Sequence, residues 1–176
     1  MVSSLKACFN VTFGFIPLIF LWSISNKLGI VLGLVSISIL FIKNIINKNI
    51  GIMSVVLLAY FAISNILFFY FKMDVVIQYR YLTSYIVLAL MGFISIGLER
   101  PYTMYEAKSG YREDFGESPL FIEVNSLITK IWATIYLVNA IIELLGHNTS
   151  TVIIMNILVA VGVALSIIIP GLLPEA

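Results

Sequence analysis

Long runs of apolar residues, separated by short polar breaks, make up most of the 176-residue chain. A helix that crosses the hydrocarbon core of a bilayer needs about 20 residues. Six runs approach or exceed this length, at Phe9–Ile24, Leu28–Ile42, Ile50–Phe71, Tyr81–Leu98, Pro119–Leu145 and Thr151–Ile169. The pattern predicts an all-α bundle of six transmembrane helices that forms one domain over residues 1–176. Five spans are the alternative, because the first run is short and Pro17 interrupts it.

Composition places the chain in the membrane and excludes several functional classes. Hydrophobic residues make up 61% of it and charged residues 11%, against about 45–50% and about 25% in soluble domains. The near-neutral balance of charges offers nucleic acid no attractive field. A single cysteine and a single histidine leave no Cys- or His-based metal cluster. We expect a non-enzymatic protein without metal or cofactor, although an enzyme acting on lipid or isoprenoid substrates stays open.

The basic residues predict the orientation of the spans. With six spans, one side of the membrane carries Lys6, Lys43, Lys48, Arg100, Lys108 and Arg112, and the other carries Lys27, Lys72 and Arg80. Loops on the cytoplasmic side of a membrane carry an excess of Lys and Arg. This asymmetry predicts that both termini are cytoplasmic.

One hydrophilic connection, residues 99–118, separates the fourth and fifth spans. Thr103 and Glu106 have the spacing of a capping box, which predicts a short helix around Met104–Ser109. Its tyrosines suit the headgroup layer of the membrane. Two interpretations are open, since the connection either turns the chain at the interface or docks a partner. The candidate partner-facing residues are Arg100, Pro101, Tyr102, Thr103, Glu106 and Lys108.

The fifth span carries a row of polar and aromatic side chains spaced three or four residues apart, which places them on one helix face. We call this row the polar stripe; it consists of Asn125, Thr129, Trp132, Tyr136, Asn139 and Glu143. Hydrocarbon offers polar groups no hydrogen-bond partners, so the stripe should face the bundle interior. The opposite face, with Ile131, Ile135, Val138 and Ile142, should lie nearer the lipid. The stripe either holds helices together or lines a pocket.

The chain resembles a family of small uncharacterised bacterial integral membrane proteins with the motif Pro-Phe-Thr-x3-Ala-Arg, then Ser-Pro-x-Phe-x3-Asn-x3-Thr-x2-Trp. The matching residues here are Pro101, Tyr102, Thr103, Ala107, Lys108, Ser118, Pro119, Phe121, Asn125, Thr129 and Trp132. More distantly, it resembles the intracellular septation protein A family in length, span order and the early Phe15-Ile16-Pro17-Leu18. It keeps that family's Asp before the fourth span, as Asp74, but lacks the Lys-Trp-Lys-Pro that follows.

These resemblances imply a multi-pass protein of the bacterial inner membrane with a role in the cell envelope. We therefore expect a component of a membrane complex, bound to the lipid bilayer and to a membrane-protein partner or a second copy of itself. The alternative from another class is a transporter of ions or small molecules, or a substrate-binding membrane subunit. In that case the polar stripe would line its pocket.

Overall fold

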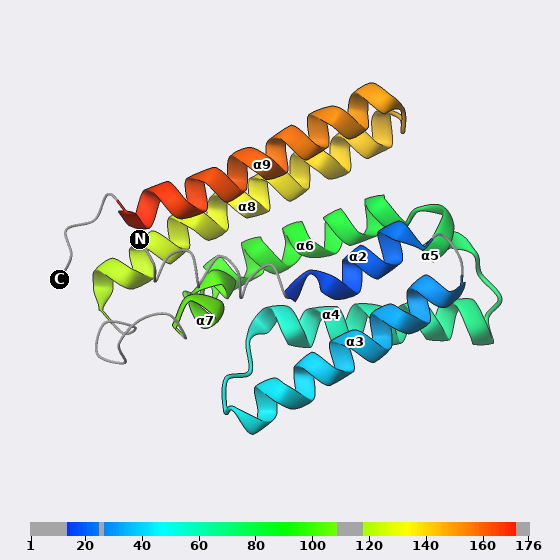
Figure 1. Ribbon diagram of the computed structural model, residues 1–176, viewed down its shortest axis with the longest axis horizontal. Helices are drawn as coiled ribbons and strands as arrows, with labels where there is room; N and C mark the ends of the chain where they lie inside the picture. Colours follow the sequence, from blue (N-terminus) through cyan, green and yellow to red (C-terminus); the bar gives the residue numbers. More distant parts are fainter. Residues whose placement is uncertain (1–13, 25–26, 109–117, 172–176) are drawn as a thin grey trace.

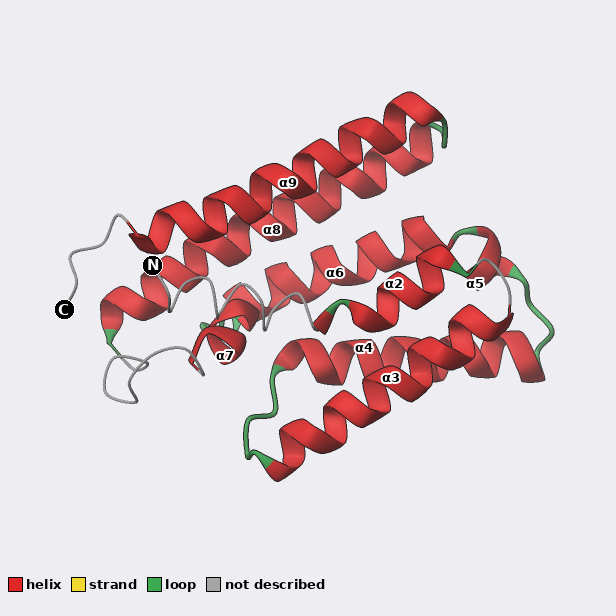
Figure 2. Ribbon diagram, in the orientation of Figure 1, coloured by secondary structure: helices red, strands yellow, loops and turns green. Residues whose placement is uncertain are grey.

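The computed structural model describes residues 14–24, 27–108 and 118–171. Within these ranges every regular element is helical (Figure 2). The elements are α2 (Ile16–Ser23), α3 (Lys27–Ile46), α4 (Ile52–Asn65), the π-helical turn η1 (Ile66–Tyr70), α5 (Val75–Gln78), α6 (Arg80–Gly97), α7 (Tyr102–Lys108), α8 (Pro119–Leu145) and α9 (Thr149–Gly171). The prediction of an all-α bundle is confirmed.

Five of the described segments are long and apolar enough to cross a membrane, namely α3, α4 with η1, α6, α8 and α9. The chain is therefore a multi-pass membrane protein. The first predicted run contributes the eight-residue α2, which extends only about 12 Å and is too short to cross alone. Residues 1–13, which include the rest of that run, lie outside the described ranges.

The long helices succeed one another across the molecule in the order α9, α8, α6, α4 and α3, while α2 lies beside α6 and α3 (Figure 1). The α3–α4 connection and α7 lie at one end of the bundle, which we call the α7 end. The turn between α8 and α9 and the short helix α5 lie at the opposite end, the α5 end. Lys43, Lys48 and Arg100 belong to the α7 end, and successive spans run in opposite directions.

The most extensive contact between two helices is that of α6 with α8. A Cβ added to Gly92 of α6 would lie 2.7 Å from the Cβ of Ala133 on α8, so the glycine lets the two backbones approach. Gly29 and Gly33 on α3 also lie where the helix packs closely against its neighbours. Gly29 faces the carbonyl end of α2, and Gly33 faces the ring of Phe61 on α4.

Local signals in the sequence set both ends of α8 as predicted. The Ser118 hydroxyl accepts a hydrogen bond from the Phe121 N–H at 3.2 Å, and Pro119 occupies the first turn. At the other end the helix stops at Leu145, and Gly146 follows with a φ of 139°. Residues with a side chain rarely adopt this backbone conformation, so glycine favours the end of the helix here. The 27 residues between hold the polar stripe in one continuous helix.

Candidate functional site

Five members of the polar stripe point into the bundle. Asn125, Thr129, Trp132, Tyr136 and Asn139 are between 0% and 7% exposed. The prediction that this face of the fifth span turns away from lipid is therefore confirmed. Thr129 and Asn139 are fully enclosed, so no water-sized space touches either side chain.

The prediction for the opposite face of α8 is wrong at one position. Ile135 is buried rather than facing lipid, because α9 packs on this side of the helix. A Cβ on Gly162 of α9 would lie 2.8 Å from the Cδ1 atom of Ile135. Val138 is exposed, as predicted, and Ile131 and Ile142 are half-buried.

The short helix α7 covers the end of the stripe that lies nearest to the 99–118 connection. Thr103 donates to the carbonyl oxygen of Asn125 at 3.0 Å, and its oxygen lies 2.8 Å from the Thr129 hydroxyl oxygen. Because one hydroxyl carries one hydrogen, the Thr129 hydroxyl must donate to Thr103. The result is a chain of two hydrogen bonds that ties α7 to α8.

Tyr102 inserts beside this chain and is 1% exposed. Its N–H donates to the Ser95 hydroxyl of α6 at 3.2 Å, and its hydroxyl lies 3.5 Å from that of Tyr136 on α8. Burial raises the pKa of the Tyr102 hydroxyl, so it stays protonated at physiological pH and keeps its hydrogen-bond donor. Tyr102 thus fastens α7 to α6 and α8 together.

These contacts correct the prediction for the 99–118 connection. Pro101, Tyr102 and Thr103 are buried, so they cannot form a partner-facing surface, and the Tyr102 side chain is enclosed by protein instead of being available to lipid headgroups. The capping box is also wrong, because the helix already begins at Tyr102 and the Thr103 hydroxyl bonds to α8. Arg100 is exposed.

The prediction of a partner-facing surface also includes Glu106 and Lys108, and the structure does not test it there. Glu106 and Lys108 belong to α7, but their side chains lie outside the described part of the structure, as do residues 109–117. Any role for these charges therefore stays a prediction.

Aromatic side chains fill the middle of the stripe. The Trp132 indole N–H donates to the Ser166 hydroxyl of α9 at 2.9 Å. Its ring stacks on Tyr136 with centroids 5.4 Å apart, and Phe15 packs 6.5 Å and 6.2 Å from the same two rings. This cluster joins the segment before α2 to α8 and α9.

Asn139 differs from the rest of the stripe. Its side chain is fully buried, and neither its amide nitrogen nor its amide oxygen has a hydrogen-bond partner among the described residues. The Tyr85 hydroxyl of α6 interacts with it, but without hydrogen-bond geometry. A buried amide without partners costs about 1–3 kcal/mol, so Asn139 lowers the stability that the polar stripe otherwise provides.

Glu143, at the α5 end of the stripe, is paired across the helix terminus. Its Oε2 atom accepts from His147 Nδ1 at 2.9 Å, and the glutamate side chain is only 13% exposed. The His147 ring stacks on Tyr81 of α6 with centroids 5.1 Å apart. Within the described ranges, no three His, Cys, Asp or Glu side chains gather into a metal-binding group.

Several partners of the stripe were not predicted. Ser95 and Ser166 receive bonds from Tyr102 and Trp132, and Tyr85 approaches Asn139. The two serines carried a usable signal, since each places a hydroxyl between apolar neighbours within its span. Tyr85 gave no comparable signal.

The two parts of the sequence motif contact one another in the fold. Ala107 of the first part and Phe121 of the second pack together in a small buried cluster with Met104. Thr103 likewise meets Asn125 and Thr129. Several residues of the motif therefore lie at the contact between α7 and α8. Comparison of the chain with protein-family models, curated proteins and solved structures finds no match.

Proposed function

We propose that the protein is a non-enzymatic component of a membrane complex in the cell envelope of a bacterium, comparable to septation-type envelope proteins. The observation that carries this proposal is the enclosure of the polar stripe. Thr129 and Asn139 are 0% exposed and Asn125 is 3% exposed. A solute pathway along α8 would need open space beside these groups.

The hydrogen bonds of the stripe support the same conclusion. Thr129 binds α7 and Trp132 binds α9, so these polar groups are used to join helices. Such bonds between transmembrane helices contribute about 0.6 kcal/mol each on average. A framework held in this way suits a protein that presents a fixed surface to a partner.

The proposal places the protein in the bacterial inner membrane with both termini in the cytoplasm. Lys43, Lys48 and Arg100 lie at the α7 end, and the sequence adds Lys6, Lys108 and Arg112 to the same side. This excess supports a cytoplasmic α7 end under the positive-inside rule.

The proposed partner surface is the charged part of the 99–118 connection, without its buried residues. Glu99 and Arg100 are exposed, and Glu106 and Lys108 follow within α7. Tyr102 and Thr103 attach α7 to α6 and α8, so the backbone that carries these charges is held against the bundle. The partner is another membrane protein or a second copy of this chain.

Cross-linking in native membranes tests this surface. The triple variant Arg100→Gln, Glu106→Gln and Lys108→Gln should lose the partners that the unmodified chain captures. The matched control, Lys27→Gln, Lys72→Gln and Asp74→Asn, removes the same charges at the α5 end and should keep them. Equal capture by both variants, measured by quantitative mass spectrometry, would refute the assignment.

A second candidate function is transport of an ion or small molecule, and Asn139 is the observation that favours it. Its unpartnered amide lies one turn from the Glu143–His147 pair. The substitution Asn139→Leu separates the two functions. In a structural component it should preserve partner capture and raise stability by about 1 kcal/mol or more, because a buried unsatisfied amide is removed. In a transporter it should abolish uptake.

A further inference from the structure

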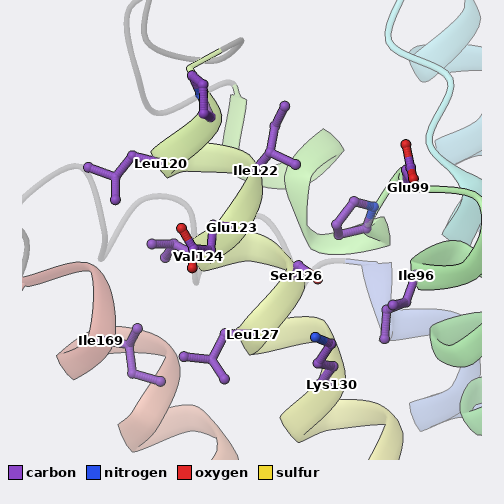
Figure 3. A pocket seen from close by; sticks show the side chains of 12 residues that line it. Ile96, Glu99, Leu120, Ile122, Glu123, Val124, Ser126, Leu127, Lys130 and Ile169 are labelled. Carbon is purple, nitrogen blue, oxygen red and sulfur yellow. The ribbon is translucent and has the colours of Figure 1, made fainter.

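A groove opens at the α7 end, on the outer side of α8. It has a volume of about 970 Å³ and is bounded by the end of α6, the first turns of α8 and the end of α9 (Figure 3). Its walls are largely apolar, with Ile96 from α6, Leu127 from α8 and Ile169 from α9. This groove lies on the opposite side of α8 from the enclosed polar stripe.

Three charged side chains also line the groove, and all three are exposed: Glu99, Glu123 and Lys130. Among the described residues, none of them forms an ion pair. Glu123 and Lys130 are seven residues apart, which places them two turns apart on nearly the same side of α8. Figure 3 shows Lys130 beside Ile96, whereas Glu99 and Glu123 lie on opposite sides of α8.

The depth of these charges matches a lipid headgroup. Lys130 lies beside Ile96, one residue before α6 ends at Gly97, so it is level with the end of a neighbouring span (Figure 3). A lysine at such a depth extends its ammonium back to the interface. The ammonium then meets the level of lipid phosphates, while the two glutamates lie further out, nearer water.

We propose that this groove binds a phospholipid whose headgroup carries both a phosphate and a primary ammonium. Lys130 pairs with the phosphate, Glu123 accepts hydrogen bonds from the ammonium, and the apolar walls hold the acyl chains. Charge complementarity selects this class of lipid. An anionic headgroup without an ammonium would offer the Glu123 carboxylate no positive charge.

Native mass spectrometry of the purified full chain tests the proposal. The probes are phosphatidylethanolamine, its trimethylated counterpart phosphatidylcholine, and phosphatidylglycerol, all with identical acyl chains. Phosphatidylethanolamine should bind most tightly. Lys130→Gln should weaken its binding about tenfold, because a charge-assisted hydrogen bond is lost. Glu123→Gln should weaken the binding of phosphatidylethanolamine by a similar factor. It should also reduce the ratio of the affinity for phosphatidylethanolamine to that for phosphatidylglycerol.

The control variant is Lys43→Gln, which removes an exposed lysine at the same end of the bundle but outside the groove. It should leave lipid binding unchanged. Equal affinity for the three lipids, or equal effects of Lys43→Gln and Lys130→Gln, would overturn the proposal. Circular dichroism of each variant checks that the helices are retained, so that a loss of binding is assigned to the missing charge.

Discussion

Removing the Thr103 hydroxyl with Thr103→Val breaks both hydrogen bonds that tie α7 to α8. Thr103 donates to the Asn125 carbonyl oxygen and accepts from Thr129, whereas the Thr129 hydroxyl takes part in only the second of these bonds. Valine has nearly the same volume as threonine, so the change tests the hydroxyl. The two threonines should therefore respond unequally although both are buried.

The expected losses follow from the number of bonds that each variant removes. At about 0.6 kcal/mol for each bond between membrane helices, Thr103→Val should cost about 1.2 kcal/mol and Thr129→Val about 0.6 kcal/mol. The double variant should cost about 1.2 kcal/mol, because Thr103→Val alone already removes both bonds. The loss in the double variant should therefore be about 0.6 kcal/mol smaller than the sum of the two single losses.

Reversible unfolding in mixed micelles, followed by tryptophan fluorescence as the denaturing detergent is increased, measures these free energies. Thr134→Val is the matched control, because this exposed threonine bonds only to the Lys130 carbonyl of its own helix. It should change stability by less than about 0.5 kcal/mol. Equal costs for Thr103→Val and Thr129→Val, or losses that add in the double variant, would refute the hydrogen-bond chain.

Two further predictions use the same unfolding measurement. Gly33→Ala should destabilise the protein by about 1–3 kcal/mol, because the added methyl group meets the ring of Phe61; Gly97→Ala enters open space and should change stability by less than about 0.5 kcal/mol. Ser166→Ala should cost about 0.6 kcal/mol by removing the acceptor of the Trp132 indole. In a Trp132→Phe background the same change should cost nothing, and a full loss there would contradict the contact.

Much of the fold follows from the lengths of the apolar runs. The prediction for the fifth span, Pro119–Leu145, coincides with α8, and the boundaries of the next span differ by only two residues at each end. The boundaries of α8 were predictable because Ser118, Pro119 and Gly146 act locally. The inward orientation of the stripe was equally predictable, since the cost of polar groups in hydrocarbon does not depend on tertiary detail.

The behaviour of α7 was not predictable from local pattern. Thr103 has the spacing of a cap, but its hydroxyl bonds to a helix whose contacting residues lie more than twenty positions later. Ile135 was misplaced for a related reason, because burial of the outer face of α8 depends on where α9 packs. In both cases the competing partner is distant in sequence, so periodicity within one segment gives no information about it.

We expect the aromatic rings around the π-helical turn η1 to hold the bundle at a fixed depth in the bilayer. Phe69, Tyr70 and Phe71 are all exposed at this turn. The rings pair edge to face, Phe68 with Phe69 and Tyr70 with Phe71, each with centroids 5.0 Å apart. A shift of the bundle along the membrane normal in one direction would bury the Tyr70 hydroxyl in hydrocarbon. A shift in the other direction would remove the aromatic rings from contact with acyl chains. The turn therefore resists displacement in either direction.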